Sequence, residues 1–470
     1  MRTSSYVVYV RLPKSGEYML AHGYTGAIDV VSKGIADSLR FGKYDRLPVT
    51  AIETLKRRGY LTDLSVTQER EHVSQFAILL QKRESIRRNY AFVVAYDCNF
   101  HCGYCYERLI SKDGSAWSGE TFTERAVDAA YAAMDQLSPA KGIPATITLY
   151  GGEPLLKKNG RVVHYIVSQG ASRGYDFCAI TNGYELDSYI DLIGSKLINR
   201  LQVTIDGDER DHDSRRFLYT GEGTFRKIFS NVTLALRLGA AVSLRVNVDE
   251  ENVDGLSELA ANMRDAGWPD SPNFKCQIAF TQSVNAAPAG IISTNLRPPC
   301  FCGDGPGSLP TRRDGIACHL AGKREEDPEF CVFALPGDSL KGQLKEVITS
   351  RKGFHYRGSH CGASAGNVMF DPRGDIYACW ESVGTLSDKI GEFFPELRVN
   401  SDSFSMWSQR TIASLEPCSR CKYSLLCGGG CAAFARRKYG SLNRSYCDGF
   451  PALFRASARS AYEETVAEGR

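Results

Sequence analysis

The chain has 470 residues, of which 43% are hydrophobic and 24% are charged, as in a globular protein of two or three domains. Its 57 basic residues nearly balance its 54 acidic residues, which argues against nucleic acid or a membrane surface as a partner. No apolar run approaches the roughly 20 residues of a membrane helix, and no signal-like apolar block opens the sequence. We therefore expect a cytoplasmic protein.

Residues 1–88 are expected to form a leading unit that resembles a winged helix. The segments 6–10 and 18–20 predict a hairpin across a short turn. Helical spacing of apolar residues then predicts a helix from Ile28 to Leu39 and a second helix near 51–58. The basic run at the end of the second helix is more simply a solvated helix face than a DNA-binding patch.

Strands and helices alternate from residue 89 to residue 281. This alternation predicts a parallel sheet with right-handed crossovers, open or partly closed into a barrel. In such a fold, functional residues lie just after the carboxyl ends of the strands. The expected strands are 91–95, 145–150, 177–180, 201–205, 242–248 and 274–280.

The rest of the chain has a different character. Residues 282–352 begin with a turn-rich stretch and are expected to be a linker or insertion. Residues 353–450 are rich in cysteine and glycine, and 451–470 are expected to form a terminal helix.

Sixteen cysteines are unusual for a chain of this kind. Because the cytosol keeps thiols reduced, closely spaced cysteines favour metal binding or catalysis over disulfides. They gather at 98–105, at 300–331 and from Cys361 onward. Cys178 and Cys276 stand alone within strands, so we expect both to be buried structural thiols.

The first cysteine group follows the first expected strand of the sheet. Cys98, Cys102 and Cys105 fall within eight residues, with no fourth cysteine nearby. An all-cysteine iron–sulfur or zinc site has four protein thiolates. Three ligands instead leave one metal corner open for a substrate. On these residues alone, a zinc site completed from elsewhere in the chain is the alternative.

Further features lie at the ends of the next strands. Gly151-Gly152-Glu153-Pro154 follows one strand, Thr-Asn182-Gly ends the next, and Thr204 ends the one after. Two glycines permit a close backbone approach, and the carboxylate can receive an ammonium group. Together with the C-x3-C-x2-C spacing and an aromatic Tyr104 before the last cysteine, this ordered set resembles the radical SAM superfamily.

The resemblance implies an α/β fold, a partial (β/α)6 barrel, that holds a [4Fe–4S] cluster on Cys98, Cys102 and Cys105. In that family the open iron chelates S-adenosylmethionine (SAM), whose reductive cleavage gives a 5′-deoxyadenosyl radical that abstracts hydrogen. The electron comes from an external flavodoxin- or ferredoxin-like donor. The implied SAM contacts are Tyr104 beside the adenine, Gly151, Gly152, Glu153 and Pro154 at the methionyl amine, Asn182, Thr204 near the ribose or methionine, and Arg245 at the carboxylate.

The C-terminal cysteines have a spacing that resembles the SPASM domain, the auxiliary-cluster module of radical SAM enzymes that modify peptides and proteins. Taken alone, four of them would form a zinc site. The resemblance implies two auxiliary [4Fe–4S] clusters, and so three clusters in all. One would be held by Cys418, Cys421, Cys427 and Cys447, and the other by Cys361, Cys379 and Cys431.

The site of Cys361, Cys379 and Cys431 lacks a clear fourth ligand. Some relatives carry a cysteine six residues before Cys361, where this chain has His355. A member of the 300–331 group could complete the site, or the site could stay open for a substrate thiolate. That group consists of Cys300, Cys302, Cys318 and Cys331.

Two subfamilies compete for the reaction. Anaerobic sulfatase-maturating enzymes carry an Asp directly after the cysteine at the Cys379 position, whereas this chain has Trp380 and then Glu381. That difference argues against formylglycine formation, although Glu381 could substitute. Maturases of ribosomally made (RiPP) peptides instead use an N-terminal winged-helix-like element, which binds the precursor's leader as an added β-strand. Residues 6–20 supply a candidate edge.

We therefore expect a peptide maturase that abstracts hydrogen from a leader-bearing precursor and installs a thioether or carbon–carbon cross-link. Epimerisation and oxidative decarboxylation stay open, and a zinc-stabilised nucleic-acid-binding protein is the non-enzymatic alternative. The expected domains are 1–88 for leader recognition, 89–281 for the barrel, 282–352 for the linker, 353–450 for the SPASM domain and 451–470 for a helix.

Overall fold

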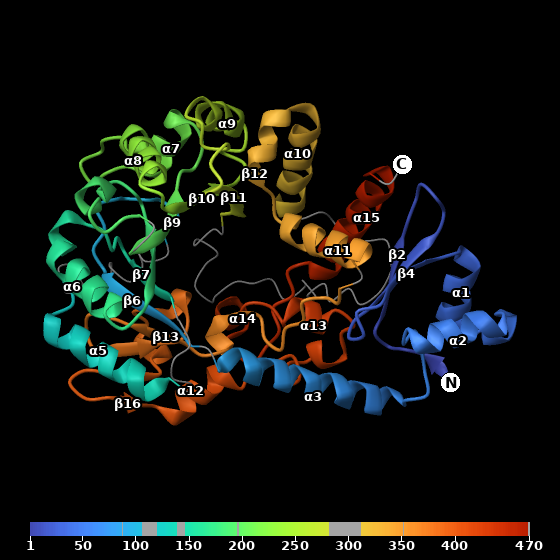
Figure 1. The fold of residues 1–470 in the computed structure, drawn as a ribbon. Coiled ribbons are helices and arrows are strands. Elements are labelled where there is room, and N and C mark those ends of the chain that lie inside the picture. Colours follow the sequence, from blue (N-terminus) through green and yellow to red (C-terminus); the bar gives the residue numbers. More distant parts are fainter. Residues whose placement is uncertain are drawn as a thin grey trace.

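The computed structural model describes residues 1–86, 88–105, 120–138, 146–194, 197–281, 312–350 and 352–468, with the backbone alone at 312–315, 317 and 318. Cys300 and Cys302 lie outside the described residues, and so does the side chain of Cys318. Figure 1 shows an α/β unit on one side, the N-terminal unit on the other and the cysteine-rich region between them. Within the described residues, no helix is long and apolar enough to cross a membrane.

Parallel strands in sequence order form the centre of the α/β unit, as the alternating pattern predicts. They are β6 (Asn89–Ala95), β7 (Thr146–Gly151), β8 (Asp176–Thr181), β9 (Ile198–Thr204), β10 (Ala241–Val248) and β11 (Phe274–Phe280). Each corresponds to an expected strand, because runs of β-branched and aromatic residues suit strands covered on both faces.

Helices cover the outside of these strands (Figure 1). The ring of Phe92 in β6, for example, lies 5.4 Å from that of Tyr131 in α5. The helices are α5 (Glu124–Leu137), α6 (Gly160–Ala171), α7 (Glu209–Arg215), α8 (Phe225–Arg237) and α9 (Leu256–Asp265). The carboxyl ends of the strands therefore carry the loops that hold the candidate site.

The sheet continues past the barrel at both edges. At one edge, β12 (Phe333–Ala334) pairs in parallel with β11. At the other, β13 (Asn367–Phe370) pairs in parallel with β6, and β14 (Asp375–Tyr377), β15 (Gly391–Glu392) and β16 (Arg398–Val399) follow antiparallel. The cysteine-rich region is thus joined to the strand that precedes Cys98.

Part of the expected linker is regular structure. Residues 312–350 contain α10 (Arg312–Glu326) and α11 (Asp338–Ser350), with β12 between them. The turn-rich composition of the first part of 282–352 does not extend to these residues, so this part of the expected linker or insertion contains helices and a short strand.

The N-terminal unit contains the expected hairpin, β2 (Val7–Arg11) and β3 (Tyr18–His22). A third strand, β4 (Ile28–Val31), pairs with β3, which is therefore the central strand. The expected helix was wrong over its first turn, since the β-branched residues of β4 are in a strand and Ser32 caps α1 (Lys33–Phe41). Then follows α2 (Val49–Arg57), and β1 (Arg2–Thr3) pairs with β5 (Leu61–Thr62).

The long helix α3 (Val66–Ser85) was not predicted, because its apolar residues do not form one stripe. It begins with a capping box of Ser65 and Gln68 and runs from the N-terminal unit toward the barrel (Figure 1). Near its end, the Gln81 side-chain amide donates to the Ser364 carbonyl at 2.8 Å. The helix therefore fastens the N-terminal unit to the cysteine-rich region.

The C-terminal region is built mainly of loops and short helices. Its long elements are α12 (Ser401–Ser408), α14 (Ala432–Tyr439) and α15 (Phe450–Glu468), and α13 (Ser424–Cys427) is one turn. One face of the N-terminal sheet packs with α11 and α15 in a shared core that includes Val10, Leu344 and Phe454. The 3-10 helices are η1 (Tyr44–Arg46), η2 (Lys157–Asn159), η3 (Leu186–Tyr189), η4 (Pro328–Val332), η5 (Gly362–Ser364), η6 (Trp380–Ser382), η7 (Leu386–Asp388) and η8 (Cys418–Arg420).

Candidate functional site

The first cysteine group lies in the loop directly after β6. Cys102 is buried, whereas Cys98 and Cys105 are half-buried by overall accessibility. The Phe100 amide donates to the Cys98 Sγ at 3.4 Å. Burial raises the pKa of Cys98 well above its usual value, and negative charge on Cys102 or Cys105 raises it further. The three thiols are thus electrostatic neighbours within one loop.

This donor set fits an iron–sulfur cluster. Thiols that raise one another's pKa resist ionisation by themselves, and a bound cationic centre favours their thiolate form. Within the described residues, no three His, Cys, Asp or Glu side chains are close enough together to hold a single metal ion. A four-iron cluster is larger than one ion, and its ligands lie correspondingly farther apart.

The Gly-Gly-Glu-Pro segment after β7 is clamped to the backbone that leads into Cys98. A Cβ on Gly152 would lie 2.5 Å from the carbonyl oxygens of Tyr96 and Asp97, so a larger residue has no room. The Gly152 amide donates to the Ala95 carbonyl at 3.0 Å, and the Glu153 amide donates to the Asp97 carbonyl at 2.8 Å. Nearby, the Asn159 side chain donates to the carbonyl of Pro154 at 3.3 Å.

Glu153 is buried beneath this clamp. Its carboxyl group accepts hydrogen bonds from the Thr181 hydroxyl at 2.6 Å, the Leu155 amide at 2.9 Å and the Asn182 amide at 2.5 Å. Burial nevertheless raises the pKa of Glu153 to about 7. A ligand ammonium group beside this carboxyl would favour its ionised form.

Asn182 links Glu153 to the cysteine loop. Its side-chain amide donates to the Asn99 Oδ1 at 2.7 Å and lies 3.9 Å from the Cys98 Sγ. Its backbone amide binds Glu153. The structure therefore brings Cys98, Glu153 and Asn182 together at the carboxyl ends of β6, β7 and β8.

Thr204 and Arg245 are directly opposite each other in the pairing of β9 with β10. Side chains alternate along a strand, and their neighbours Val203, Leu244 and Val246 belong to the core shared with the helices. Thr204 and Arg245 therefore face the barrel interior. The Arg245 Nε donates to the Asn247 Oδ1 at 2.8 Å.

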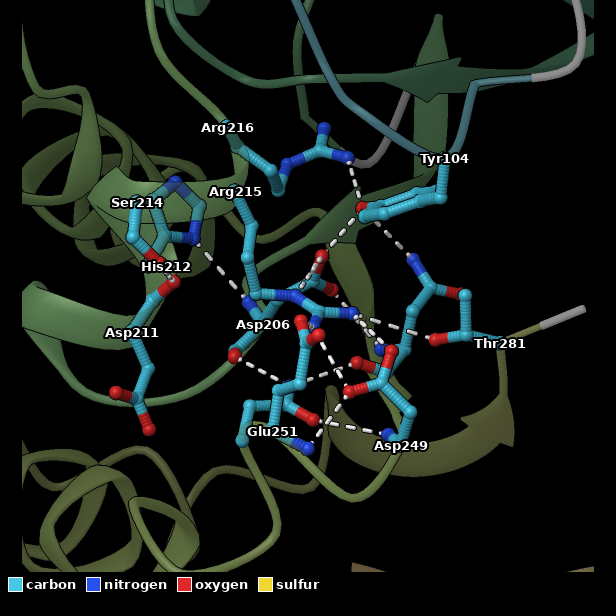
Figure 2. Close-up of polar contacts among 12 residues, drawn as sticks. Tyr104, Asp206, Asp211, His212, Ser214, Arg215, Arg216, Asp249, Glu251 and Thr281 are labelled. Atoms are coloured by element: carbon cyan, nitrogen blue, oxygen red, sulfur yellow. Dashed lines mark hydrogen bonds and ion pairs between the residues drawn. The ribbon is translucent and has the colours of Figure 1, made fainter. Parts of the chain in front are cut away.

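Tyr104 extends from the cysteine loop into a polar network inside the barrel (Figure 2). Its hydroxyl contacts the Asp206 carboxylate, and it accepts from the Arg216 guanidinium at 2.7 Å and the Asn247 side chain at 3.2 Å. The Arg215 guanidinium lies over the Tyr104 ring, 5.4 Å from its centroid. The phenol thus ties the loop between Cys102 and Cys105 to β9, β10 and the end of α7.

Two arginines in this network, the half-buried Arg215 and the buried Arg216, were missed from the sequence, where an Arg-Arg pair beside acidic residues resembles a surface helix end. Arg215 makes a two-pronged ion pair with Asp249, at 2.9 and 2.8 Å (Figure 2). Arg216 lies over the Phe100 ring, 5.6 Å from its centroid, as well as on Tyr104. Burial raises the pKa of the Cys102 thiol, and the charge of Arg216 opposes that rise.

Cys361, Cys379 and Cys431 form a second group outside the barrel. Cys379 follows β14 and is buried, Cys361 precedes η5 and is exposed, and Cys431 caps α14. Burial raises the pKa of Cys379 to about 12, and negative charge on Cys361 or Cys431 raises it further. Cys361 and Cys431 are therefore electrostatic neighbours of Cys379.

Among the fourth ligands considered from the sequence, neither His355 nor Cys331 is among the groups that most shift the pKa of Cys379 or Cys431. His355 and Cys331 are exposed, His355 near Glu84 of α3 and Cys331 on η4, which packs against α9. Glu381 is the carboxylate whose negative charge raises the pKa of both Cys379 and Cys431. It is also ion-paired with Arg437 at 2.6 Å.

Cys418, Cys421, Cys427 and Cys447 form a third group. Burial raises the pKa of Cys427 to about 12, and charge on Cys418 or Cys447 raises it further. Cys421 is in the same turn as Cys418, since its amide donates to the Cys418 carbonyl at 3.0 Å. Of the two isolated cysteines, Cys276 is fully buried and Cys178 is half-buried, both within strands.

An aromatic pair lies between the barrel site and the second group. Tyr150, at the end of β7, contacts Trp380 edge to face with ring centroids 4.7 Å apart. Burial raises the pKa of Tyr150 well above its usual value, with further increases from Glu381, Cys105 and Cys379. Tyr150 is therefore next to both cysteine groups, a role that its sequence position before Gly151 did not indicate.

Comparisons with known proteins identify the barrel. Residues 92–262 match the model of the radical SAM superfamily. The chain is 26% identical over 181 residues to a probable GTP 3′,8-cyclase from Pyrobaculum aerophilum, a match that covers 37% of this chain and 53% of that relative. The chain thus spans about half the length of that curated relative. It is also 19% identical over 401 residues to the radical SAM cyclopropyl synthase TigE from Paramaledivibacter caminithermalis, covering 82% of this chain and 77% of TigE.

Solved structures share the fold. Native anSMEcpe with bound AdoMet has a TM-score of 0.54 at 15% identity, over 81% of this chain and 98% of that chain. Its complex with AdoMet and the Cp18Cys peptide has a TM-score of 0.53 at 14% identity, over 81% and 97%. Residues 92–262 therefore form a radical SAM domain, the domain of enzymes that use SAM and a [4Fe–4S] cluster.

Proposed function

We propose that this radical SAM enzyme is a peptide maturase that installs a thioether or carbon–carbon cross-link in a ribosomally made precursor. The observation that carries the proposal is the pair of further thiol groups attached to the barrel through β13, which extends the sheet at β6. The pair fits two auxiliary clusters beside the barrel opening. The peptide complex among the structures of similar fold is consistent with a peptide substrate.

Cys98, Cys102 and Cys105 would hold the cluster that binds SAM. When bound, the cluster and SAM supply a 5′-deoxyadenosyl radical for hydrogen abstraction. Glu153 would receive the SAM ammonium group, while Gly151, Gly152 and Pro154 shape the backbone around it. The interior positions of Thr204 and Arg245 suit contacts to the methionyl and carboxylate groups. Tyr104 would flank the adenine with its ring, as its hydroxyl anchors the loop.

The auxiliary clusters would be held by the second and third groups of thiols. Cys418, Cys421, Cys427 and Cys447 would saturate one cluster and suit it for electron transfer. Cys361, Cys379 and Cys431 would hold the other, with its fourth position near Glu381 or open to a substrate thiolate. A flavodoxin- or ferredoxin-like protein would deliver electrons to the enzyme.

The N-terminal unit would recognise the leader, but through β4 rather than through residues 6–20. β3 is central, and β2 lies beside α15, where the Arg459 Nε donates to the Arg11 carbonyl at 3.2 Å. Among the described strands, β4 pairs with β3 alone. Its other edge suits an added strand.

The outward backbone group of β4 can be identified from the ladder. The His22 amide donates to the Ala27 carbonyl at 2.8 Å, so these two residues form a hydrogen-bonded pair of the antiparallel β3–β4 ladder. Along such a ladder, pairs of opposed residues are alternately hydrogen-bonded and non-hydrogen-bonded. Val30, opposite Met19, falls at a non-bonded pair and directs its amide outward. The corresponding carbonyl of Ile28 is already bound by Arg58 at 3.0 Å.

Formylglycine formation is the second candidate. The negative charge of Glu381 raises the pKa of Cys379 and Cys431, so its carboxylate lies where a base beside this site would be needed. Its carboxylate is held in place by the ion pair with Arg437 at 2.6 Å. A sulfatase-derived peptide that is oxidised faster than any leader-bearing peptide would favour this candidate.

The test is co-expression with short reading frames beside the gene, followed by mass spectrometry of the peptides. Cross-linking removes two hydrogen atoms from the peptide, and Cys102→Ala should abolish that change. Val30→Pro should weaken precursor binding without stopping uncoupled SAM cleavage to 5′-deoxyadenosine. Val30→Ala is the matched control, because it shortens the side chain and keeps the amide.

Unchanged binding of the precursor by Val30→Pro would refute leader recognition at β4. Deletion of residues 1–85 is a less specific test. It also removes α3, which is hydrogen-bonded to the cysteine-rich region through Gln81.

A further inference from the structure

Arg410 is a buried cation at the centre of the cysteine-rich region. It follows α12, and 1% of its surface is exposed. Its guanidinium donates to backbone carbonyls from two separate segments. These are Leu442 at 2.7 Å, Gly430 at 3.0 Å, Arg444 at 3.0 Å and Gly429 at 3.5 Å.

All of these partners are neutral. Among the described residues, no carboxylate forms an ion pair with Arg410. A guanidinium remains protonated in proteins, and an isolated charge removed from water is costly even when it is hydrogen-bonded. The arrangement therefore lacks an anion.

The groups that can supply negative charge are the thiols of both C-terminal groups. Burial lowers the pKa of Arg410, while Cys361 and Cys431 of one group and Cys418 and Cys427 of the other raise it. Its hydrogen bonds to the carbonyls of Gly429 and Gly430 place Arg410 beside the segment that joins Cys427 of one group to Cys431 of the other. Bound as iron–sulfur ligands, these cysteines would be thiolates.

The chain between Cys427 and Cys431 is shaped to bring carbonyls to Arg410. It is a run of glycines, and Gly430 has a φ of +76°. A Cβ on Gly430 would lie 1.7 Å from the Tyr446 carbonyl oxygen, so no other residue fits. The segment that links the two thiol groups therefore also wraps the guanidinium.

We propose that Arg410 is the shared counter-charge of the two auxiliary cluster sites, a positioning residue that favours anionic clusters in both and couples their charge states. This inference rests on the auxiliary clusters of the proposed function. Because one guanidinium serves both sites, loading or reducing one site alters the electrostatic stabilisation of the other. The chemical class of ligand at each site is an anionic, thiolate-bound iron–sulfur cluster.

The test compares Arg410→Gln with Arg410→Lys in enzyme reconstituted anaerobically with iron and sulfide. Iron per chain and the midpoint potentials of the clusters, followed by electron paramagnetic resonance, are the readouts. Arg410→Gln should shift the auxiliary potentials to more negative values or lose about eight irons, and leave the barrel cluster unchanged. Arg410→Lys should retain the iron, with auxiliary potentials between those of the unaltered enzyme and Arg410→Gln.

Arg420→Gln is the matched control. Arg420 is between Cys418 and Cys421, but it is exposed and paired with Glu416 at 3.4 Å. Its replacement should leave iron content and potentials unchanged. Auxiliary iron and potentials that are the same in Arg410→Gln as in the unaltered enzyme would overturn the proposal.

If both Arg410 variants lose the auxiliary iron, the proposal is tested instead by amide hydrogen exchange of the unaltered enzyme, measured with and without its clusters. Removal of the clusters should speed exchange of amides at 428–431 and 442–446 at least tenfold while the barrel strands stay protected, and equal protection would overturn the proposal. About four irons per chain in the unaltered enzyme would refute the auxiliary clusters themselves. About twelve irons with an unaffected Arg410→Gln would refute the role of Arg410 alone.

Discussion

The barrel site and the cysteine-rich region hold their cysteines by different means. In the barrel, parallel strands β6 to β10 fix the loop through Glu153, Asn182 and Tyr104. In the cysteine-rich region, loops and short helices surround a buried arginine, whose partners are carbonyls. The hydrophobic core of the barrel extends into the cysteine-rich region at residues such as Phe370 and Trp407. We therefore expect the order of the loops around Arg410, rather than of the whole region, to depend on what the thiols bind.

Each region contains a buried arginine, and the two differ in the charge of their partners. Arg216 is bound by the hydroxyl of Tyr104, which also contacts Asp206, so its charge has a nearby carboxylate. Arg410 has four neutral carbonyl partners and the thiols of two sites. Loss of clusters should therefore loosen the cysteine-rich region more than the barrel.

The largest expected effect separates the two regions by function. Cys102→Ala should lower the iron content from about twelve to about eight per chain and abolish SAM cleavage. Cys427→Ala should lower the iron content by a similar amount, keep SAM cleavage and lose peptide turnover. Iron analysis and 5′-deoxyadenosine release measure both. Equal loss of SAM cleavage in the two variants would show that the regions do not act separately.

The next effect tests the carboxylate of the barrel site. Glu153→Gln should weaken SAM binding about tenfold to a hundredfold, the value of a hydrogen bond to a charged group. The pKa of Glu153 is raised to about 7, and the ionised form binds an ammonium group. SAM affinity should therefore fall as the pH drops below 7, by up to about tenfold per pH unit.

Equilibrium binding of SAM between pH 6 and 8 measures both changes. The Gln variant should show no such pH dependence from this residue. An identical pH profile in the variant and the unaltered enzyme would exclude Glu153 as the titrating group.

A smaller effect tests the anchor of the cysteine loop. Tyr104→Phe keeps the ring but removes the hydroxyl that joins Asp206, Arg216 and Asn247. Groups left buried without partners should lower the free energy of unfolding by about 1–3 kcal/mol. Anaerobic denaturation measures the loss. Tyr90→Phe is the control, because it removes a tyrosine hydroxyl that is hydrogen-bonded to Ser138, outside the site. A Tyr104→Phe protein that is as stable as the unaltered one would contradict the anchoring role.

The smallest effect tests the joint between the two regions. The Tyr96 hydroxyl, at the end of β6, donates to the Asp371 carboxyl in the β13–β14 turn at 2.7 Å. Asp371 also accepts from the amides of Arg373 and Asp375, so it keeps partners when Tyr96 is changed. Tyr96→Phe should cost about 0.5–1.5 kcal/mol in unfolding and leave the iron content unchanged. A loss of auxiliary iron would show that this contact supports the clusters.

Much of the barrel and its cysteine loop could be predicted from the sequence. Its strands are short apolar runs bounded by turn residues, and motifs such as Gly151–Pro154 stand at their ends, where parallel strands place functional groups. Because Glu153 and Asn182 directly follow such strands, their positions at the carboxyl ends of the sheet could also be predicted. β4 was predicted as part of a helix, because a four-residue, mainly apolar segment fits a helical as well as a strand period.

The charged interior could not be predicted in the same way. Arg216 and Arg410 each stand in polar stretches that are typical of exposed surface, and their burial depends on partners far along the chain, such as Tyr104 and Leu442. The grouping of the C-terminal cysteines by their spacing stays a prediction, with which the electrostatic neighbours of Cys379 and Cys427 are consistent. The spacing did not indicate that Glu381, rather than His355 or Cys331, is the further group beside Cys379.

We propose that three unequal cluster sites serve this one enzyme. The most direct test is iron and sulfide analysis with Mössbauer spectroscopy on the anaerobically reconstituted chain, with and without SAM. About twelve irons and twelve sulfides per chain, with the spectrum of one cluster changed by SAM, are expected. About four irons, or zinc in place of iron at the C-terminal cysteines, would contradict it.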